Sequence, residues 1–314
     1  MHVYSDGKRH EDRPSESTKR ENLVSKFRAL AAKLYKCGQR LRASVIAAMY
    51  AFKDGGIVTY SITEVEYGDI LKGKRILITG GSSGIGLALA KKCVQLGGSV
   101  MITGRKQSKL DKAIAQIGSR NLFSVTWDVS DTSLAESMLN HCRSVLGGEI
   151  DVLVNNAGVI DTTSFLEVSE EQWDRVYATN SRGLFFLTQT VCRQWKESGC
   201  KQRKVINISS QGGYVGATYP YRMSKWDVAG LTQGLGLKLA GSGIIVNGIA
   251  PGIVATAMQP SLEKRKNNIF CPHNPLKRSA LPEEIAELGV FLISDTSNFI
   301  VGQTIVCDGG FSIK

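Results

Sequence analysis

Tyr221 and Lys225 have side-chain types and a spacing that could move a proton. They stand four positions apart, so they share one face of a helix, and the apolar periodicity predicts a helix from about Met223 through Leu239. A free phenol has a pKa of about 10 and exchanges protons poorly at neutral pH. A neighbouring ammonium group favours the phenolate and lowers that pKa. The pair is therefore a candidate general acid and base.

A glycine-rich run, Thr79 to Gly86, follows an apolar strand-like segment and precedes a predicted helix, Leu87–Leu96. Gly80 allows a tight turn, Gly84 lets the backbone approach a pyrophosphate, and Gly86 lets the helix pack against the strand. The helix N-terminus presents free N–H groups and positive potential to phosphate. The segment therefore predicts a dinucleotide-binding turn.

The spacing T-G-x-x-x-G-x-G is the first of several family motifs. The others are Asp128 in W-D-V-S-D, Asn155 to Gly158 in N-N-A-G, Asn180 in N-S-R-G, Ser210 in I-N-I-S-S, Tyr221 to Lys225 in Y-R-M-S-K, Pro251-Gly252, and Asp308 to Gly310 in D-G-G. On these motifs the chain resembles the short-chain dehydrogenase/reductase family, and 3-oxoacyl-acyl-carrier-protein reductases in particular. The resemblance covers about residues 71 to 310.

The resemblance implies a catalytic set of Ser210, Tyr221, Lys225 and Asn180. In the reducing direction the cofactor would give a hydride to a carbonyl carbon while Tyr221 protonates the carbonyl oxygen. Ser210 would hold the same oxygen as its negative charge develops. The ammonium of Lys225 and the positive ring of an oxidised nicotinamide would lower the pKa of Tyr221. Asn180 would position a water and Lys225 for proton transfer.

Two features around these residues depart from the family pattern. The interval from Ser210 to Tyr221 is about two residues shorter than in many relatives, and Pro220 favours an extended entry to the helix. Ser209 is the alternative to Ser210. The substrate pocket is expected to involve Tyr214, Tyr219 and Trp195.

The resemblance also implies the cofactor contacts. They are Thr79, Gly80, Ser82, Ser83, Gly84, Ile85, Gly86, Arg105, Asp128, Val129, Asn156, Ala157, Gly158, Tyr221, Lys225, Pro251, Gly252, Ile253 and Thr256. Gly104 occupies the position of the acidic residue that binds the ribose 2′-OH in NAD enzymes, and Arg105 follows it. A guanidinium can pair with a 2′-phosphate, which favours NADP(H) over NAD(H). The absence of a basic residue at Ser82-Ser83 leaves NAD(H) as the alternative.

From Lys72 onward, apolar strand-like runs alternate with helical periodicity. The expected strands are Arg75–Thr79, Ser99–Thr103, Leu122–Thr126, Val152–Asn155, Lys204–Ser209, Ile244–Ile249 and Thr304–Val306. This alternation predicts an α/β fold, a doubly wound (Rossmann) parallel sheet in a single domain. Residues 257 to 281 are irregular and basic, as expected of a mobile loop over a substrate.

The N-terminal part has a different composition. We expect a disordered tail at 1–20, an amphipathic basic helix and linker at 21–70, and the Rossmann-type domain at 71–314. Residues 1–56 carry twelve Lys and Arg against six Asp and Glu, which is more than half of the net charge of +11. We expect the apolar stripe of 21–52 to pack on the protein itself or on a second subunit, with a peripheral membrane surface as the alternative.

Composition limits the remaining classes. The 314 residues are 42% hydrophobic with 33 glycines, which fits a globular α/β protein. The seven cysteines include no C-x-x-C pair and no zinc-site spacing, so we expect reduced thiols and no metal. No segment has the pattern of a signal peptide or the roughly 20 apolar residues of a membrane span. We therefore expect a cytoplasmic protein without a nucleic-acid partner.

Three functions remain open. The leading one is an NADP(H)-dependent oxidoreductase that interconverts a ketone and a secondary alcohol, acting as a homotetramer or homodimer through the helices after Asn180 and Tyr221. The second is a cofactor-binding sensor or scaffold that uses the basic N-terminal helix. The third is an NAD(H)-dependent dehydrogenase or epimerase on the same fold. The sequence does not identify the substrate.

Overall fold

The computed structural model describes residues 68–199, 202–256 and 270–313, together with Gly38, Leu41 and Val45. The chain divides into two units, Met1–Gly56 and Ile57–Lys314. The three described residues of the first unit are helical, with the side chains of Leu41 and Val45 exposed. The other predictions for residues 1–67, and the first part of the expected substrate loop, lie outside the described residues.

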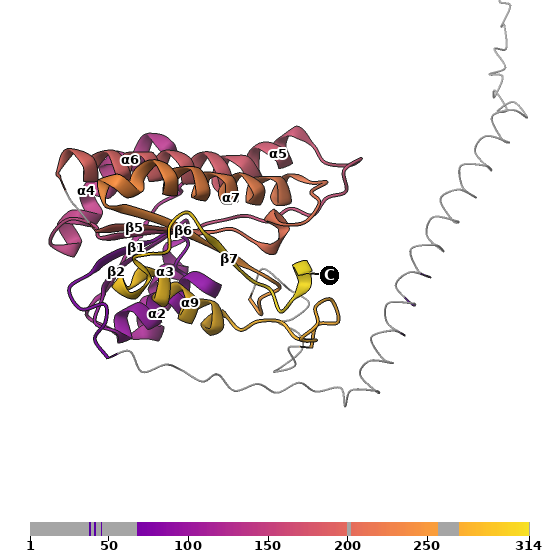
Figure 1. The fold of residues 1–314 in the computed structure, drawn as a ribbon, viewed down its shortest axis with the longest axis horizontal. Coiled ribbons are helices and arrows are strands. Elements are labelled where there is room, and N and C mark those ends of the chain that lie inside the picture. Colours follow the sequence, from indigo (N-terminus) through magenta and orange to yellow (C-terminus); the bar gives the residue numbers. More distant parts are fainter. Residues whose placement is uncertain are drawn as a thin grey trace, which may run out of the picture. The chain divides into compact units, whose positions relative to one another are not determined.

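Seven parallel strands form one sheet in the second unit (Figure 1). They are β1 Arg75–Ile78, β2 Ser99–Gly104, β3 Leu122–Thr126, β4 Val152–Asn155, β5 Arg203–Ile208, β6 Ile244–Pro251 and β7 Thr304–Cys307. Their order is β3-β2-β1-β4-β5-β6-β7, so the chain winds outward in both directions from the β1/β4 pair. This confirms the predicted doubly wound sheet, whose ligand crevice lies outside the carboxyl ends of the strands where the order reverses.

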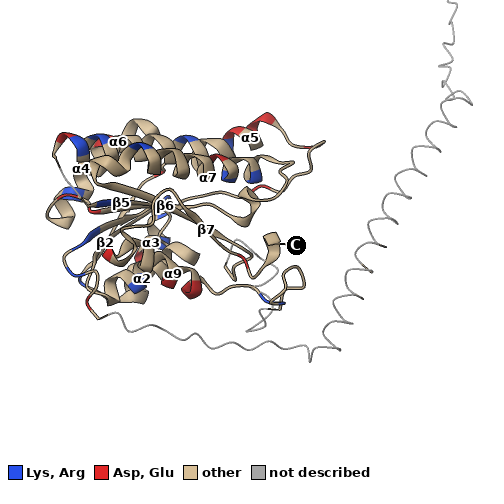
Figure 2. Cartoon of the chain, in the orientation of Figure 1, with Lys and Arg blue, Asp and Glu red and all other residues tan. Residues whose placement is uncertain are grey.

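Helices cover both faces of the sheet. They are α2 Gly84–Gln95, α3 Gln107–Ile117, α4 Ala135–Leu146, α5 Glu170–Tyr177, α6 Leu184–Glu197, α7 Pro220–Leu239 and α9 Pro282–Ile293. Figure 1 shows α2, α3 and α9 on one side and α4 to α7 on the other, and Figure 2 shows charged residues along these helices. Within the described residues, no helix is long and apolar enough to cross a membrane.

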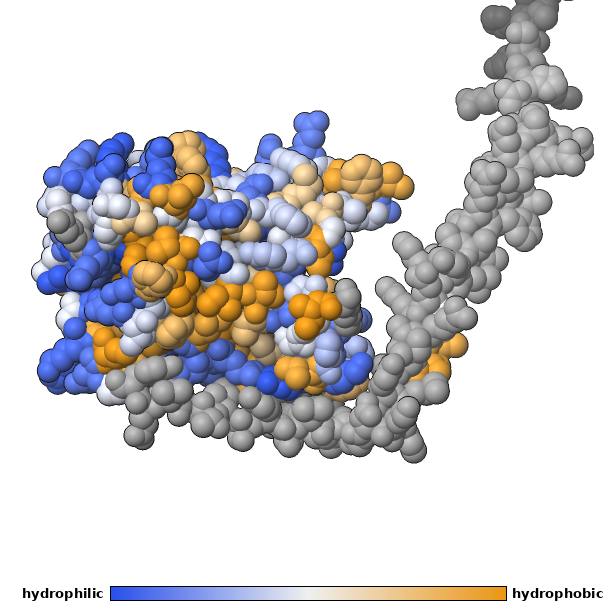
Figure 3. All heavy atoms as spheres, in the orientation of Figure 1, coloured by the Kyte–Doolittle hydropathy of each residue, from blue (hydrophilic) through white to orange (hydrophobic). Residues whose placement is uncertain are grey.

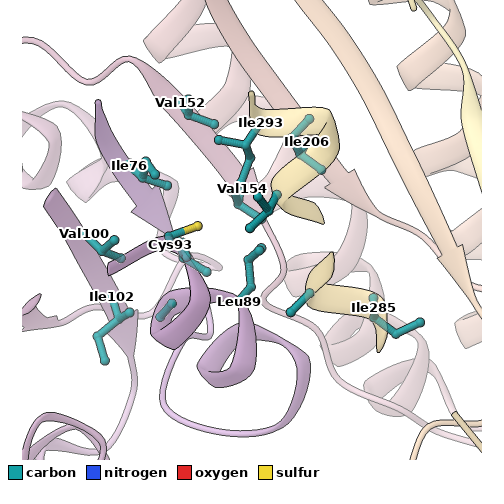
Figure 4. Close-up of a cluster of buried hydrophobic side chains, with 14 of the residues drawn as sticks. Ile76, Leu89, Cys93, Val100, Ile102, Val152, Val154, Ile206, Ile285 and Ile293 are labelled. Carbon is teal, nitrogen blue, oxygen red and sulfur yellow. The ribbon is translucent and has the colours of Figure 1, made fainter. Parts of the chain in front are cut away.

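Alternate residues of the strands face two separate cores. Ile76 and Ile78 of β1 pack in the core on the α2 and α9 side, whereas Leu77 packs in the core on the other side. Figure 4 shows the first core, where Leu89 of α2 and Ile285 of α9 meet the strand residues. Each fully buried side chain of this kind contributes about 1.5–3 kcal/mol. Burial on both faces explains why the strands are continuous apolar runs in the sequence.

Candidate active site

A cavity of about 400 Å³ opens at the carboxyl ends of the strands. Most residues predicted to bind the cofactor or to act in catalysis line it. They are Gly80, Ser82, Ser83, Gly84, Ile85, Arg105, Asp128, Val129, Asn156, Ala157, Gly158, Ser210, Tyr221, Lys225, Pro251, Gly252 and Thr256. Residues from seven separate segments of the sequence therefore meet around one space.

Four predicted residues do not line the cavity. The Thr79 hydroxyl accepts hydrogen bonds from the amides of Asn156 and Ala157 at 3.1 and 3.0 Å. Gly86 lies one turn inside α2, Asn180 is buried behind the cavity wall, and the Ile253 carbonyl accepts from the amide of Ala280 at 2.8 Å. Thr79 and Gly86 thus hold the walls of the cavity in place.

The glycine-rich turn leaves the N-terminus of α2 free for an anion. Ser83, the N-cap, is extended and makes no side-chain capping bond, and the first turn contains no acidic residue. Gly80 has a φ of +66°, and a Cβ on it would lie 2.8 Å from the Cα of Ala157. The turn therefore needs glycine both for its backbone conformation and for its contact with the neighbouring segment. The free N–H groups of the helix fit the pyrophosphate of a dinucleotide.

Two buried polar atoms in the cavity-lining residues have no hydrogen-bond partner among the described residues. They are the Oγ1 of Thr103 and the Nε1 of Trp127, in side chains that are 0% and 3% exposed. Unsatisfied buried polar groups are costly and rare in folded proteins. Such groups fit a cavity whose bound ligand supplies the missing partners, as the nucleotide half of NAD(P) would.

Sequence reasoning missed two lysines at the same end of the cavity. Lys106 and Lys109 line it beside Arg105, where Lys106 is the N-cap of α3. Like α2, α3 begins without an acidic residue or a side-chain cap. The sequence shows these basic residues close together where a helix begins. That all of them face the cavity depends on how α3 packs on the sheet.

Tyr221 and Lys225 share the cavity-facing side of α7. The helix begins at Pro220, three residues earlier than predicted, because proline is well suited to a first helical position and Tyr219 before it is extended. The Lys225 Nζ lies 5.8 Å from the centre of the Tyr221 ring and donates a hydrogen bond of 2.8 Å to the Ile208 carbonyl. The lysine thereby ties the helix to the end of β5.

Burial sets the protonation states of this pair. It raises the pKa of Tyr221, an effect that the nearby Ser210 hydroxyl opposes. Burial also lowers the pKa of Lys225 to about 8. Without the cofactor, loss of hydration is the largest effect on the Tyr221 pKa. The predicted lowering, which also requires the positive nicotinamide ring, stays a prediction. At neutral pH the geometry presents a neutral phenol beside an ammonium group.

The structure separates the two adjacent serines. The Ser209 hydroxyl donates to the Lys225 carbonyl at 2.8 Å and is buried, so its donor is already used. The Ser210 hydroxyl accepts from the Gly212 amide at 3.1 Å and its side chain is only half-buried. Ser210, rather than the alternative Ser209, is therefore the serine whose hydroxyl lies next to Tyr221.

Asn180 lies in a π-helical segment, Ala178–Gly183, between α5 and α6. Its Nδ2 donates to the Val159 carbonyl and to the Ser224 hydroxyl, both at 3.0 Å, and its Oδ1 accepts from the Val159 amide at 2.9 Å. A Cβ on Gly158 would lie 3.4 Å from this Oδ1 and 3.8 Å from the Lys225 Nζ. Asn180 and Lys225 therefore approach the same glycine. Single π turns of this kind are frequent at functional sites.

The expected substrate-pocket aromatics lie in three different places. Trp195 is 1% exposed in the core and donates to the Ile150 carbonyl at 2.7 Å, so its prediction as a pocket residue is wrong. Tyr214 stacks on Trp226 with ring centres 6.4 Å apart. Tyr219 is close enough to Tyr221 to raise its pKa further. Trp195 faces the core because its position on α6 falls on the stripe that packs against α4 and the sheet.

A crevice at the strand-order reversal of a doubly wound sheet, next to a helix N-terminus free for phosphate, is the usual place of dinucleotide binding in NAD(P)-dependent oxidoreductases. The family model "short chain dehydrogenase" matches residues 74–267. The chain belongs to that family, and with its relatives it is an oxidoreductase of the kind that interconverts ketones and alcohols. Among the described residues, no group of three or more His, Cys, Asp or Glu could hold a metal ion.

Individual relatives cover most of the second unit. Gluconate 5-dehydrogenase of Gluconobacter oxydans (strain 621H) is 33% identical over 78% of this chain and 96% of its own length. The 3-oxoacyl-acyl-carrier-protein reductase FabG of Aquifex aeolicus (strain VF5) is 34% identical over 76% of this chain and 98% of its own. A crystal structure of an actinorhodin polyketide ketoreductase variant with NADPH is 30% identical and superposes with a TM-score of 0.70, over 77% of this chain and 98% of that one.

Two helical glycines provide a matched test of the turn. A Cβ on Gly86 would lie 2.4 Å from the Asn156 Nδ2 and 2.6 Å from the Gly80 carbonyl, whereas Gly234 in α7 has open space. We expect Gly86→Ala to lower the free energy of unfolding by about 1–3 kcal/mol and to weaken NADPH binding. Gly234→Ala should raise it by about 0.5–1 kcal/mol. Urea unfolding and a fluorescence titration with NADPH measure both; equal stability of the two variants would contradict the prediction.

Proposed function

We propose that the protein is an NADP(H)-dependent reductase of ketones, working reversibly on secondary alcohols, with Tyr221 as the proton donor. One observation carries the proposal: the buried Lys225 ammonium holds α7 so that Tyr221 and Ser210 line the same cavity as the phosphate-binding turn. When bound, the nicotinamide supplies or accepts the hydride. The side chains of the protein hold the carbonyl oxygen, donate the proton and stabilise the phenolate that remains.

Tyr221 and Ser210 act on the carbonyl oxygen. Tyr221 is a neutral phenol at neutral pH because burial raises its pKa, so it can donate its proton as the oxygen gains negative charge. The Ser210 hydroxyl provides a second donor to the same oxygen. Two fixed donors in a site with little water stabilise a developing alkoxide more strongly than water would. The product is an alcohol, and Tyr221 is left as a phenolate.

Lys225 stabilises this phenolate and helps return its proton. Its hydrogen bond to Ile208 uses one of the three ammonium donors, so two remain for the cofactor and for proton exchange. Asn180 lies beside it, with the Nδ2 and Oδ1 anchored to Val159. Its role in this proposal is to fix the path between Lys225 and solvent.

The nucleotide end favours NADP(H). Arg105 and its neighbours Lys106 and Lys109 line the cavity next to Gly104, which occupies the place of the acidic residue of NAD enzymes. A Cβ at Gly104 would lie 3.3 Å from the Ser82 hydroxyl, so this corner also offers a neutral donor. Asp128 also lines the cavity, but no acidic residue stands at position 104. Three cations beside that position suit a 2′-phosphate, and the planar guanidinium can bind it through two hydrogen bonds.

Removal of the Tyr221 hydroxyl tests the proposed role of this residue as proton donor. We expect Tyr221→Phe to lower kcat for ketone reduction by at least about a hundredfold, because general acid catalysis typically contributes 10²–10⁴. NADPH should still bind within a few-fold of the wild-type affinity. The measurement is NADPH oxidation across a panel of ketones, sugars and 3-oxoacyl thioesters, with fluorescence titration for binding. Turnover that survives the substitution would rule out Tyr221 as the donor.

Loss of one cation tests the cofactor preference. Arg105→Gln should raise the Kd for NADPH by about tenfold or more, the size of one charge-assisted hydrogen-bonded contact. The Kd for NADH should change little, since NADH has no 2′-phosphate. Lys112→Gln, on the exposed side of α3, is the control for net charge. An equal loss for both cofactors would place Arg105 away from the 2′-phosphate.

We further propose a homo-oligomer formed through α6 and α7. A groove of about 790 Å³ on this helical layer is lined mainly by apolar residues, among them Tyr177, Phe185, Phe186 and Leu231. Apolar side chains also gather on the visible face over the edge strand β7 (Figure 3). Such patches mark association sites because their burial removes apolar area from water.

The oligomer has a direct test. Phe186→Glu should lower the molar mass in light scattering, since burial of a carboxylate in an apolar interface is costly even with Arg182 nearby. Val145→Glu, at an exposed position of α4, is the control. A mass that stays the same in Phe186→Glu would exclude this helix pair as the interface.

A further inference from the structure

Arg222, the residue after Tyr221, lies beside the turn that carries Ser210. A Cβ on Gly212 would be 3.0 Å from the Arg222 Cγ and 3.5 Å from the Ser210 Oγ. The stem of the arginine and the serine hydroxyl therefore flank the same glycine. Arg222 does not itself line the cavity of about 400 Å³, but its stem lies beside Ser210, which does.

The guanidinium of Arg222 is held in place by neutral groups. Its Nη1 donates to the Gly216 carbonyl at 3.0 Å, and its Cζ lies 5.2 Å from the centre of the Tyr219 ring. An aromatic ring and a backbone carbonyl orient a cation without cancelling its charge. A guanidinium has five N–H donors, so most of them remain available.

Half of the ten arginines in the described residues are neutralised by an ion pair. Arg75, Arg143, Arg175, Arg203 and Arg278 each pair with a carboxylate within 4 Å. Within the described residues Arg222 has no such ion pair. Its charge is thus positioned but uncompensated.

Tyr219 connects this cation to the reacting centre. It is the extended N-cap of α7, and it is near enough to Tyr221 to influence the pKa of that phenol. The same ring contacts the Arg222 guanidinium. The Tyr219 side chain therefore lies near both the Tyr221 phenol and the Arg222 guanidinium.

We propose that Arg222 binds a carboxylate on the part of the substrate remote from its ketone, so that the protein acts on keto acids and hydroxy acids. The inference rests on the proposed function and names its substrate class. A planar guanidinium matches a carboxylate through two parallel hydrogen bonds, which gives orientation as well as affinity. Tyr219 holds the guanidinium so that little conformational entropy is lost on binding.

The test compares acids with their uncharged amides. The panel is 4-oxopentanoate, 5-oxohexanoate and 6-oxoheptanoate with the matching primary amides, at saturating NADPH, so that chain length is not assumed. For the best length the ratio of kcat/KM for acid to amide should be well above one in wild type. Arg222→Gln should lower that ratio by about tenfold or more, as expected for a lost charge-assisted pair. Arg222→Lys should recover part of it.

Arg120→Gln is the control, since Arg120 is exposed before β3 at the opposite edge of the sheet. For Arg120→Gln the ratio of kcat/KM for acid to amide should equal that of wild type. If Arg222→Gln lowers kcat/KM for acid and amide equally, the arginine only shapes the loop, and the inference is overturned while the proposed function stands.

A binding measurement separates the two proposals. Calorimetry of the same acids and amides with Tyr221→Phe and NADPH reports recognition without turnover. Tighter binding of the acid that disappears in Arg222→Gln supports the carboxylate site even if the wild type reduces none of the ketones, a result that would overturn the proposed function alone. Equal binding of acid and amide overturns the inference.

Discussion

The hydrogen bond from the buried Lys225 ammonium to the Ile208 carbonyl is the constraint on which the site depends. It uses the last carbonyl of β5, so the chain beyond it leaves the sheet and carries Ser209 and Ser210 into the cavity wall. The Ser209 hydroxyl returns to the Lys225 carbonyl, which joins the strand end and the helix a second time. A buried charge is tolerated only with such partners. The contact that positions the lysine therefore also positions the serine.

A second set of contacts couples the other side of the cavity to the same helix. Asn180 joins the segment after β4, through Val159, to Ser224 on α7. The π turn at Ala178–Gly183 rotates this asparagine inward, whereas the flanking α5 and α6 follow ordinary helical periodicity. The segment after β4, helix α7 and the end of β5 are in this way joined by one network of hydrogen bonds.

Sequence reasoning reached the architecture because parallel buried strands are long apolar runs bounded by glycine and polar residues. All seven strands lie within two residues of their predicted bounds. Most residues of the expected site meet in one cavity because the segments that carry them follow strand ends, which a parallel sheet places on one edge. Features that depend on the packing of side chains between distant segments could not be predicted from the sequence. The inward face of Trp195, the position of Lys109 at the cavity, and the burial that raises the pKa of Tyr221 all arise from contacts between distant segments.

Gly104 has a consequence for how this protein could diverge. A side chain there would meet only the Ser82 hydroxyl at 3.3 Å and a methyl group of Leu110 at 3.6 Å, so modest adjustment admits a larger residue. Glycine and aspartate codons differ by a single base. An acidic side chain at this corner would repel a phosphate and accept hydrogen bonds from a ribose hydroxyl. Under the proposed preference for NADP(H), a lineage carrying this fold is thus one nucleotide change away from trading one cellular pool of reducing equivalents for another, with Ser210, Tyr221 and Lys225 untouched.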